Sequence, residues 1–138
     1  MARTRDACDG RCPMSPPTRI VTVDDHAPFR DAARALIDMV EDFELVEECS
    51  NGEIALAVVE EVDPDLVIID VRMKGLDGIE TARRMRTQDA SRVIVLTTSG
   101  DLSELEDLAA ACGAAALVQK HWLTPRFLRG LWIAHRRR

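Results

Sequence analysis

The sequence lacks a long hydrophobic segment. Its most apolar stretches, such as Leu66–Ile69 and Val93–Leu96, are far shorter than the ~20 residues that a bilayer span requires. The first residues also lack the apolar core of a signal peptide. These absences argue against a membrane-spanning or secreted protein and predict a soluble domain in the cytoplasm, with no membrane partner.

An excess of basic residues is also missing, because the net charge is −6. The first nineteen residues carry +2 and the last thirteen +5, which leaves −13 on the middle of the chain. A surface that grips nucleic acid is basic, so the body of this protein is not expected to bind DNA or RNA. The arginines of Arg126–Arg138 fit the C-terminal end of a helix, where positive charge is favoured.

Cysteines are few, and they offer little to a disulfide or metal framework. Only Cys8 and Cys12 have a local spacing suited to zinc, whereas Cys49 and Cys112 stand among apolar or small residues. Because a zinc site needs four converging ligands, we interpret the four cysteines as ordinary reduced thiols. Metal binding by the first pair is the weaker alternative.

The length of 138 residues fits one domain of ordinary size. Such a domain buries roughly two thirds of its unfolded surface and needs no covalent staple. Residues 1–18 contain Pro13, Pro16 and Pro17 without an apolar pattern, and we expect them to form a disordered leader. The folded domain is expected to cover residues 19–138.

From Arg19 onward, short apolar segments alternate with longer amphipathic ones. The short segments predict five strands, at 20–23, 43–49, 66–69, 93–96 and 116–119. The longer segments predict five helices, at 28–40, 52–62, 78–86, 102–112 and from 125 to the basic end. Asn51 is expected to cap the second helix, and Gly113 to end the fourth in a left-handed conformation. The alternation predicts an α/β fold whose parallel sheet is covered by helices on both faces.

Polar residues end four of the predicted strands. Asp24 and Asp25 follow the first strand, Asp70 the third, Thr97 the fourth and Lys120 the fifth. Each has an ordinary explanation on its own, as a helix cap, a strand residue or a surface charge. Right-handed crossovers, however, bring the carboxyl ends of all the strands to one edge, where ligands bind in open α/β sheets. We therefore expect these residues to form one site.

The residue types at this edge suit a cation and a phosphoryl group. Three carboxylates within ~5 Å of one another repel by kcal/mol amounts at protein-like dielectric, so the cluster needs a cation. Oxygen ligands favour Mg²⁺. An aspartate can then attack phosphorus, while a lysine and a hydroxyl stabilise the phosphoryl oxygens. No glycine-rich nucleotide loop is present, so ATP is not expected as the direct donor.

Four segments carry a family resemblance: IVTVDDHAPFRDAARALI, SNGEIAL, PDLVIIDVRMKGLDGIE and VIVLTTSGD. In this order they resemble the receiver domain of two-component response regulators, over about residues 19–135. The resemblance is to the NarL/FixJ subfamily, whose receivers usually precede a LuxR-type DNA-binding helix-turn-helix. It implies a five-stranded, doubly wound, flavodoxin-like fold.

The resemblance also implies a role for each residue at the edge. Asp70 would accept the phosphoryl group, while Thr97 and Lys120 would hold it. Asp25 would bind Mg²⁺ directly and Asp24 would support the ion through water. The complete set of protein ligands would be Asp24, Asp25, Asp70 and the backbone carbonyl of Arg72.

Three positions depart from the family pattern. Lys74 stands where proline is common, Leu117 replaces the usual Tyr or Phe of the switch, and Ala116 replaces a common glycine. The relay from Thr97 to an output surface is therefore expected to be weak or constitutive. His26 follows the acidic pair, and we expect it to pack in its loop rather than to carry protons.

The leading hypothesis is a single-domain switch that a sensor histidine kinase phosphorylates. It would act through protein contact, with an unknown output protein or as a homodimer, and with no output domain of its own. Direct DNA binding by this chain is not expected. It is not expected to be an enzyme, apart from self-catalysed phosphoryl transfer and autodephosphorylation. Two alternatives remain: a receiver cut from a LuxR-type DNA-binding transcriptional regulator, and a phosphorylation-independent interaction module.

Overall fold

The computed structural model describes residues 16–136. Five parallel strands form one sheet in the order β2-β1-β3-β4-β5. The strands are β1 (Thr18–Val23), β2 (Phe43–Cys49), β3 (Leu66–Asp70), β4 (Val93–Thr98) and β5 (Ala116–Gln119). The helices are α2 (Ala27–Asp38), α3 (Gly52–Val62), α4 (Gly78–Gln88), α5 (Glu106–Ala111) and α6 (Pro125–His135), with a 3₁₀ turn η1 (Lys120–Trp122) after β5.

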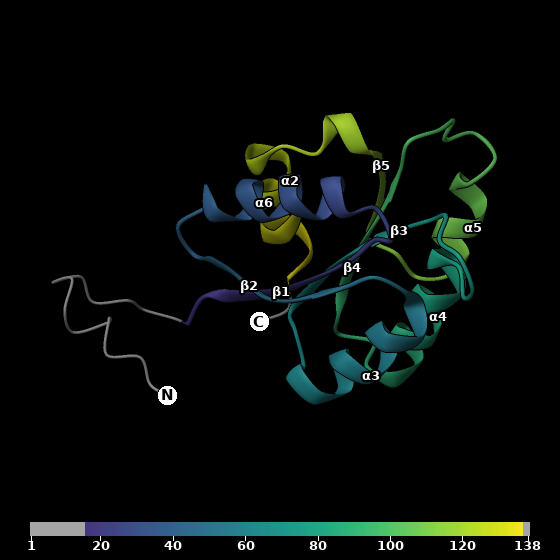
Figure 1. Ribbon diagram of the computed structural model, residues 1–138, viewed down its shortest axis with the longest axis horizontal. Coiled ribbons are helices and arrows are strands. Elements are labelled where there is room, and N and C mark those ends of the chain that lie inside the picture. The colour runs from purple at the N-terminus through teal and green to yellow at the C-terminus, as the bar shows by residue number, and fades with distance from the viewer. Residues whose placement is uncertain (1–15, 137–138) are drawn as a thin grey trace, which may run out of the picture.

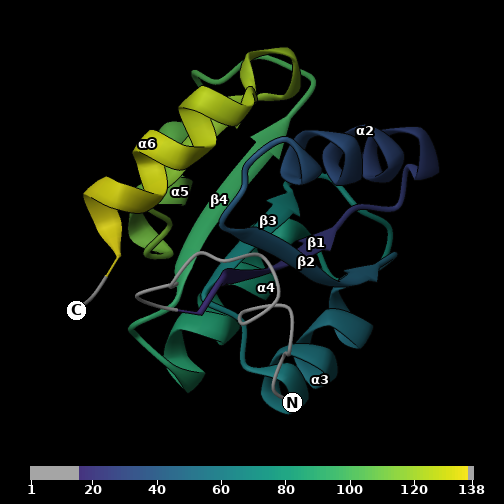
Figure 2. The same cartoon turned by 90° about the vertical axis from the view of Figure 1, so that its left-hand side faces the viewer.

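The helices cover both faces of the sheet (Figure 1), with α2 and α6 on one face and α3, α4 and α5 on the other. Every residue of β3 and β4 is buried, because both faces of these central strands are covered. Alternate residues serve the two layers: Val67 and Ile69 pack toward α3, α4 and α5, whereas Leu66 and Ile68 pack toward α2 and α6. Figure 2 shows the two layers from the side. The predicted α/β fold is confirmed.

Side-chain caps begin three of the helices. Asn51 Oδ1 accepts from the Ile54 amide at 2.8 Å, as expected, and Asp77 and Thr124 cap α4 and α6 in the same way. Gly113 follows α5 with a φ of +89°, which confirms the predicted left-handed end. None of the helices within residues 16–136 is long and apolar enough to cross a membrane.

Some boundaries differ from the prediction. β1 begins at Thr18, within the span assigned to the leader, because the Thr18 amide donates to the Asp42 carbonyl at 2.8 Å. α5 begins at Glu106 rather than at Leu102, since Asp101 accepts from the Ser103 amide at 3.0 Å and holds a turn there. α2 ends at Asp38, two residues before the predicted end.

The cysteines agree with the prediction as far as the structure describes them. Cys49 and Cys112 are free and buried, and burial raises the pKa of the Cys49 thiol to about 11. Cys8, Cys12 and the first fifteen residues of the expected leader lie outside the described part of the chain.

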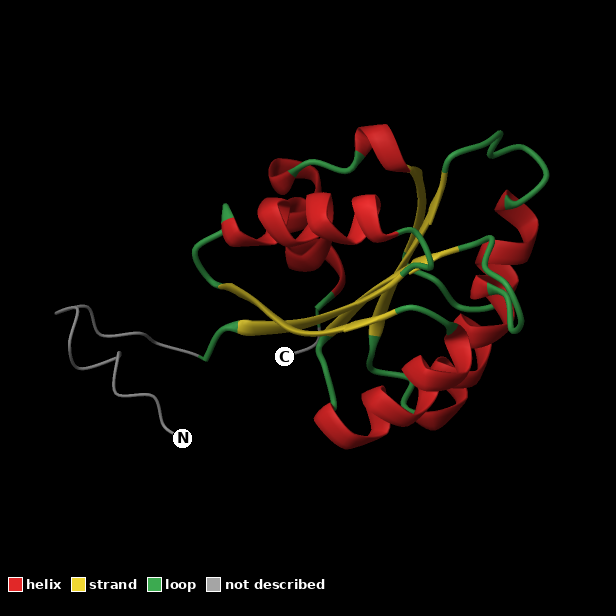
Figure 3. Cartoon of the chain, in the orientation of Figure 1, coloured by secondary structure: helices red, strands yellow, loops and turns green. Residues whose placement is uncertain are grey.

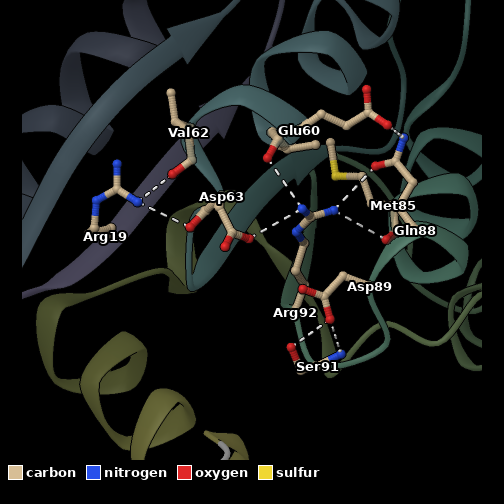
Figure 4. Close-up of polar contacts among 10 residues, drawn as sticks. Arg19, Glu60, Val62, Asp63, Met85, Gln88, Asp89, Ser91 and Arg92 are labelled. Carbon is tan, nitrogen blue, oxygen red and sulfur yellow. Dashed lines mark hydrogen bonds and ion pairs between the residues drawn. The ribbon is translucent and has the colours of Figure 1, made fainter.

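Two arginines hold helix ends at the amino side of the sheet (Figure 4). The Arg92 side chain, only 6% exposed, donates to the carbonyls of Val59 in α3 (3.2 Å) and Met85 in α4 (3.5 Å). It also pairs with Asp63 at 3.4 Å, while Arg19 donates to the Asp63 carbonyl at 3.1 Å. The Val59 and Met85 carbonyls also accept the backbone amides of Asp63 and Asp89, so Arg92 adds a second, charged donor at each of these two helix ends.

Replacing this buried guanidinium is expected to destabilise the fold. Arg92→Met should lower the free energy of unfolding by about 2 kcal/mol, because carbonyls at two helix ends lose a charged donor. The matched control is Arg84→Met, which removes an exposed pair with Glu80 and should cost less than about 1 kcal/mol. Urea unfolding followed by circular dichroism measures both. Equal losses in the two variants would contradict a special role for Arg92.

Candidate functional site

The site forms where β1, β3, β4 and β5 end, because the segments after these strands leave the sheet at the same edge (Figure 3). Three of the predicted residues converge there. Lys120 Nζ lies 2.8 Å from Asp24 Oδ2 and 3.6 Å from Asp70 Oδ1. Asp24 is 1% and Asp70 5% exposed, so both carboxylates are held away from bulk water. The strand-end pattern thus placed these groups correctly in space.

Asp24 is fixed from two sides. Its Oδ1 accepts from the His26 amide at 2.8 Å, and its backbone carbonyl accepts from Arg30 Nη1 at 2.6 Å. Its Oδ2 forms the ion pair with Lys120 but no hydrogen bond of normal geometry. A buried carboxylate oxygen therefore remains with acceptor capacity toward the site.

Asp25 lies nearer to solvent than Asp24, with 27% of its side chain exposed. Its Oδ2 accepts from the Lys74 amide at 3.2 Å. One ligand atom each from Asp24, Asp25 and His26 lie within 4.8 Å of one another. The His26 side chain is 71% exposed, so the expectation that it packs in its loop is wrong. His26 takes part in the loop through its backbone amide, which donates to Asp24 Oδ1, so its ring is left at the exposed rim of the site.

Thr97 is fully buried and lies opposite Asp70 in the register of β3 and β4. Its hydroxyl donates to the Ile69 carbonyl over a long 3.4 Å, and its carbonyl accepts from the Val71 amide at 2.8 Å. Leu117, the replacement for the usual aromatic residue, is partly buried against the layer beneath α3, α4 and α5. The hydroxyl is therefore near the site but engaged with the backbone.

Burial and the neighbouring carboxylates disfavour the ionised form of Asp70. Burial raises the pKa of Asp70 to about 6, helped by the negative charges of Asp24 and Asp25 and opposed by Lys120 and by a hydrogen bond from the Arg72 amide. Asp24 and Asp70 thus share one ammonium group, and Asp25 adds a third negative charge nearby. This negative excess, the carboxylate oxygens of the three aspartates and the open acceptor on Asp24 suit a small hard cation such as Mg²⁺.

The raised pKa predicts an unusual pH dependence for the metal-free protein. The folded state keeps the Asp70 proton up to about pH 6, whereas an unfolded aspartate loses it near pH 4. Stability is therefore expected to fall as pH rises through this window. Asp70→Asn has no proton to lose in this window. Its free energy of unfolding should therefore exceed that of the unchanged protein by about 2 kcal/mol at pH 7 and nearly equal it near pH 4. Urea unfolding in EDTA measures this, and parallel pH profiles would contradict it.

Sequence reasoning missed how closely Gly78 lies under the site. The Gly78 amide donates to the Val71 carbonyl at 2.9 Å. A Cβ at this position would stand 2.0 Å from the Asp70 carbonyl oxygen. The sequence motif placed Gly78 only at the start of a helix, because close approach between distant backbones leaves no periodic signal.

The comparison with known protein families identifies this architecture. Residues 20–130 match the response regulator receiver domain. The chain belongs to this family. The family resemblance and the fold class expected from the sequence are both confirmed.

Two relatives show how far the similarity extends. The chemotaxis protein CheY of Halobacterium salinarum is 33% identical over 78% of this chain and 88% of its own length. The nitrate/nitrite response regulator NarL of Escherichia coli K12 is 38% identical over 60% of this chain but only 39% of its own. The receiver thus spans less than half of the nitrate/nitrite regulators that it matches.

A solved structure agrees with the NarL-like character of the receiver. It is a LuxR-family two-component response regulator from Aurantimonas sp. SI85-9A1, with a TM-score of 0.79 and 31% identity over 88% of both chains.

Proposed function

We propose that this receiver accepts one phosphoryl group on Asp70 from a sensor histidine kinase and acts as a switch through protein contact. The observation that carries the proposal is the buried Asp70 carboxylate at the end of β3, with the Lys120 ammonium 3.6 Å away. An ammonium at this distance can reach an oxygen of a phosphoryl group on Asp70. The family typically works in the cytoplasm, where we place the reaction.

In the transfer, a carboxylate oxygen of Asp70 attacks phosphorus and forms an acyl phosphate. The bond from phosphorus to the donor breaks, and the donor, a histidine nitrogen or a small leaving group, keeps the electron pair. Lys120 neutralises charge on the phosphoryl oxygens. The Thr97 hydroxyl, held by a 3.4 Å bond to the Ile69 carbonyl, would turn toward one of them.

The residues that would hold Mg²⁺ are Asp24, Asp25, Asp70 and the backbone carbonyl of Arg72. When bound, the ion supplies positive charge that lowers the repulsion between the aspartates and the incoming phosphoryl group. The open acceptor on Asp24 Oδ2 and the partly exposed Asp25 support this assignment. His26 at the rim is free to contact solvent or a partner.

A second candidate function is that of the receiver in a longer DNA-binding regulator. The favouring observation is the match to NarL, of which this chain covers 39%. In both functions, phosphorylation of the receiver is the first step of the signal.

The switch itself is expected to differ from that of receivers with a Tyr at this position. Because Leu117 has no hydroxyl and a smaller side chain than Tyr, we propose a weak or constitutive switch, read by a partner protein or a second copy.

Intact mass tests the proposal. Incubation with Mg²⁺ and acetyl phosphate should add the mass of one phosphoryl group, and EDTA should prevent the addition. A phosphorylation-independent interaction module would gain no mass in either condition. That outcome would overturn the proposed function.

A further inference from the structure

Phe29 brings an aromatic ring to the lysine of the site. It lies in the first turn of α2, two residues after the helix begins, and its ring centroid is 4.4 Å from Lys120 Nζ. The ring is partly buried and packs against the apolar layer beneath α2 and α6. The ring therefore has a fixed place, and the ammonium lies over its face.

Three groups thus surround the ammonium of Lys120. Two are the carboxylates of Asp24 and Asp70, at 2.8 and 3.6 Å, and the third is the Phe29 ring. A lysine ends in a compact charge on a flexible four-carbon stem, so carboxylates alone do not fix where it rests. An aromatic face attracts a cation and prefers it above the ring, which adds a direction that the carboxylates lack.

We propose that Phe29 is a positioning residue, whose ring holds the Lys120 ammonium between Asp24 and Asp70 where a phosphoryl oxygen will need it. The inference rests on the proposed function of Asp70. The ring meets the site at the Lys120 ammonium, so Phe29 acts through Lys120 rather than on the reacting atoms. Leucine is apolar and has no ring, so it would keep part of the packing and lose the attraction, and tyrosine keeps both.

The ring contact can be observed directly, because Lys74 and Lys120 are the two lysines of the whole chain. Labelling with ¹³C-lysine gives two sets of Cε–Hε signals, and the exposed Lys74 is the internal reference. The Lys120 signals should lie upfield through the ring current of Phe29. Phe29→Leu should remove this shift and Phe29→Tyr should keep it. An unshifted Lys120 in the unchanged protein, or a shift that survives Phe29→Leu, would overturn the contact.

The positioning role is tested by the affinity for beryllofluoride, a phosphoryl mimic, in the presence of Mg²⁺. By calorimetry, Phe29→Leu should bind about three- to tenfold more weakly than the unchanged protein, and Phe29→Tyr within about twofold of it. Equal affinities of the unchanged protein and Phe29→Leu would overturn the role. So would equal weakening in both variants, because packing rather than the ring would then be responsible.

The two measurements separate this inference from the proposed function. If the unchanged protein shows the upfield Lys120 signals but binds no beryllofluoride, the proposed function of Asp70 fails. The positioning role falls with it, although the ring contact stands. If the protein binds beryllofluoride and the Leu variant binds it equally well, only the role of Phe29 fails.

Discussion

Asp70→Asn is expected to gain no phosphoryl group under conditions in which the unchanged receiver gains one. The amide has nearly the shape of the carboxylate but lacks the charged oxygen that attacks phosphorus. It should fold at least as well, because Asp70 is 5% exposed and its charged form is disfavoured there. A missing mass gain in a folded variant therefore reports chemistry rather than unfolding.

The matched control for this variant is Asp107→Asn. Asp107 is an exposed aspartate in the first turn of α5, outside the group that Asp24, Asp70 and Lys120 form. Its variant should gain one phosphoryl group as the unchanged protein does. A Mg²⁺-dependent adduct that persists in Asp70→Asn would show that another residue is the acceptor.

Gly78→Ala is expected to cost about 3 kcal/mol or more in the free energy of unfolding and to abolish phosphorylation. The added Cβ would lie 2.0 Å from the Asp70 carbonyl oxygen and 2.8 Å from Val71 Cα. Both contacts are with backbone, so no side-chain rotation can relieve them, and overpacking of this kind is strongly destabilising. The Cβ would displace the backbone of Asp70, the proposed phosphoryl acceptor, and phosphorylation should be lost for that reason.

Gly130→Ala provides the matched control. Gly130 lies inside α6, and a Cβ there would have no neighbour within 4 Å. Alanine favours a helix interior, so this variant should gain about 0.5–1 kcal/mol. Urea unfolding compares the two substitutions under the same conditions. A Gly78→Ala protein within about 1 kcal/mol of the unchanged chain would contradict the close approach.

The fold could be predicted from the sequence because its signals are local and repeat along the chain. The apolar runs of β3 and β4 predicted buried central strands, and Asn51 marked the start of α3. The prediction failed at α5, where Leu102 and Leu105 continue the apolar spacing of the helix. There the side chain of Asp101 binds the Ser103 amide and favours a turn over the helix.

The site could be predicted only as far as topology dictates it. Parallel strands bring Asp24, Asp70 and Lys120 to one edge, and the sequence shows which residues end the strands. The closeness of Gly78 to the Asp70 backbone and of Phe29 to Lys120 depends on tertiary packing. In the sequence, both look like ordinary helix residues. The buried Arg92 likewise has no periodic signal, because its partners come from the ends of two different helices.

The most direct test of the central claim is to identify the phosphorylated residue. Borohydride reduces an acyl phosphate on an aspartate to the alcohol, which converts that residue to homoserine and releases phosphate. After reaction with acetyl phosphate and Mg²⁺, peptide mass spectrometry should find homoserine at residue 70, and EDTA should prevent it. Homoserine at Asp24 or Asp25, or at no aspartate of a phosphodonor-treated protein, would contradict the assignment of Asp70 as the acceptor.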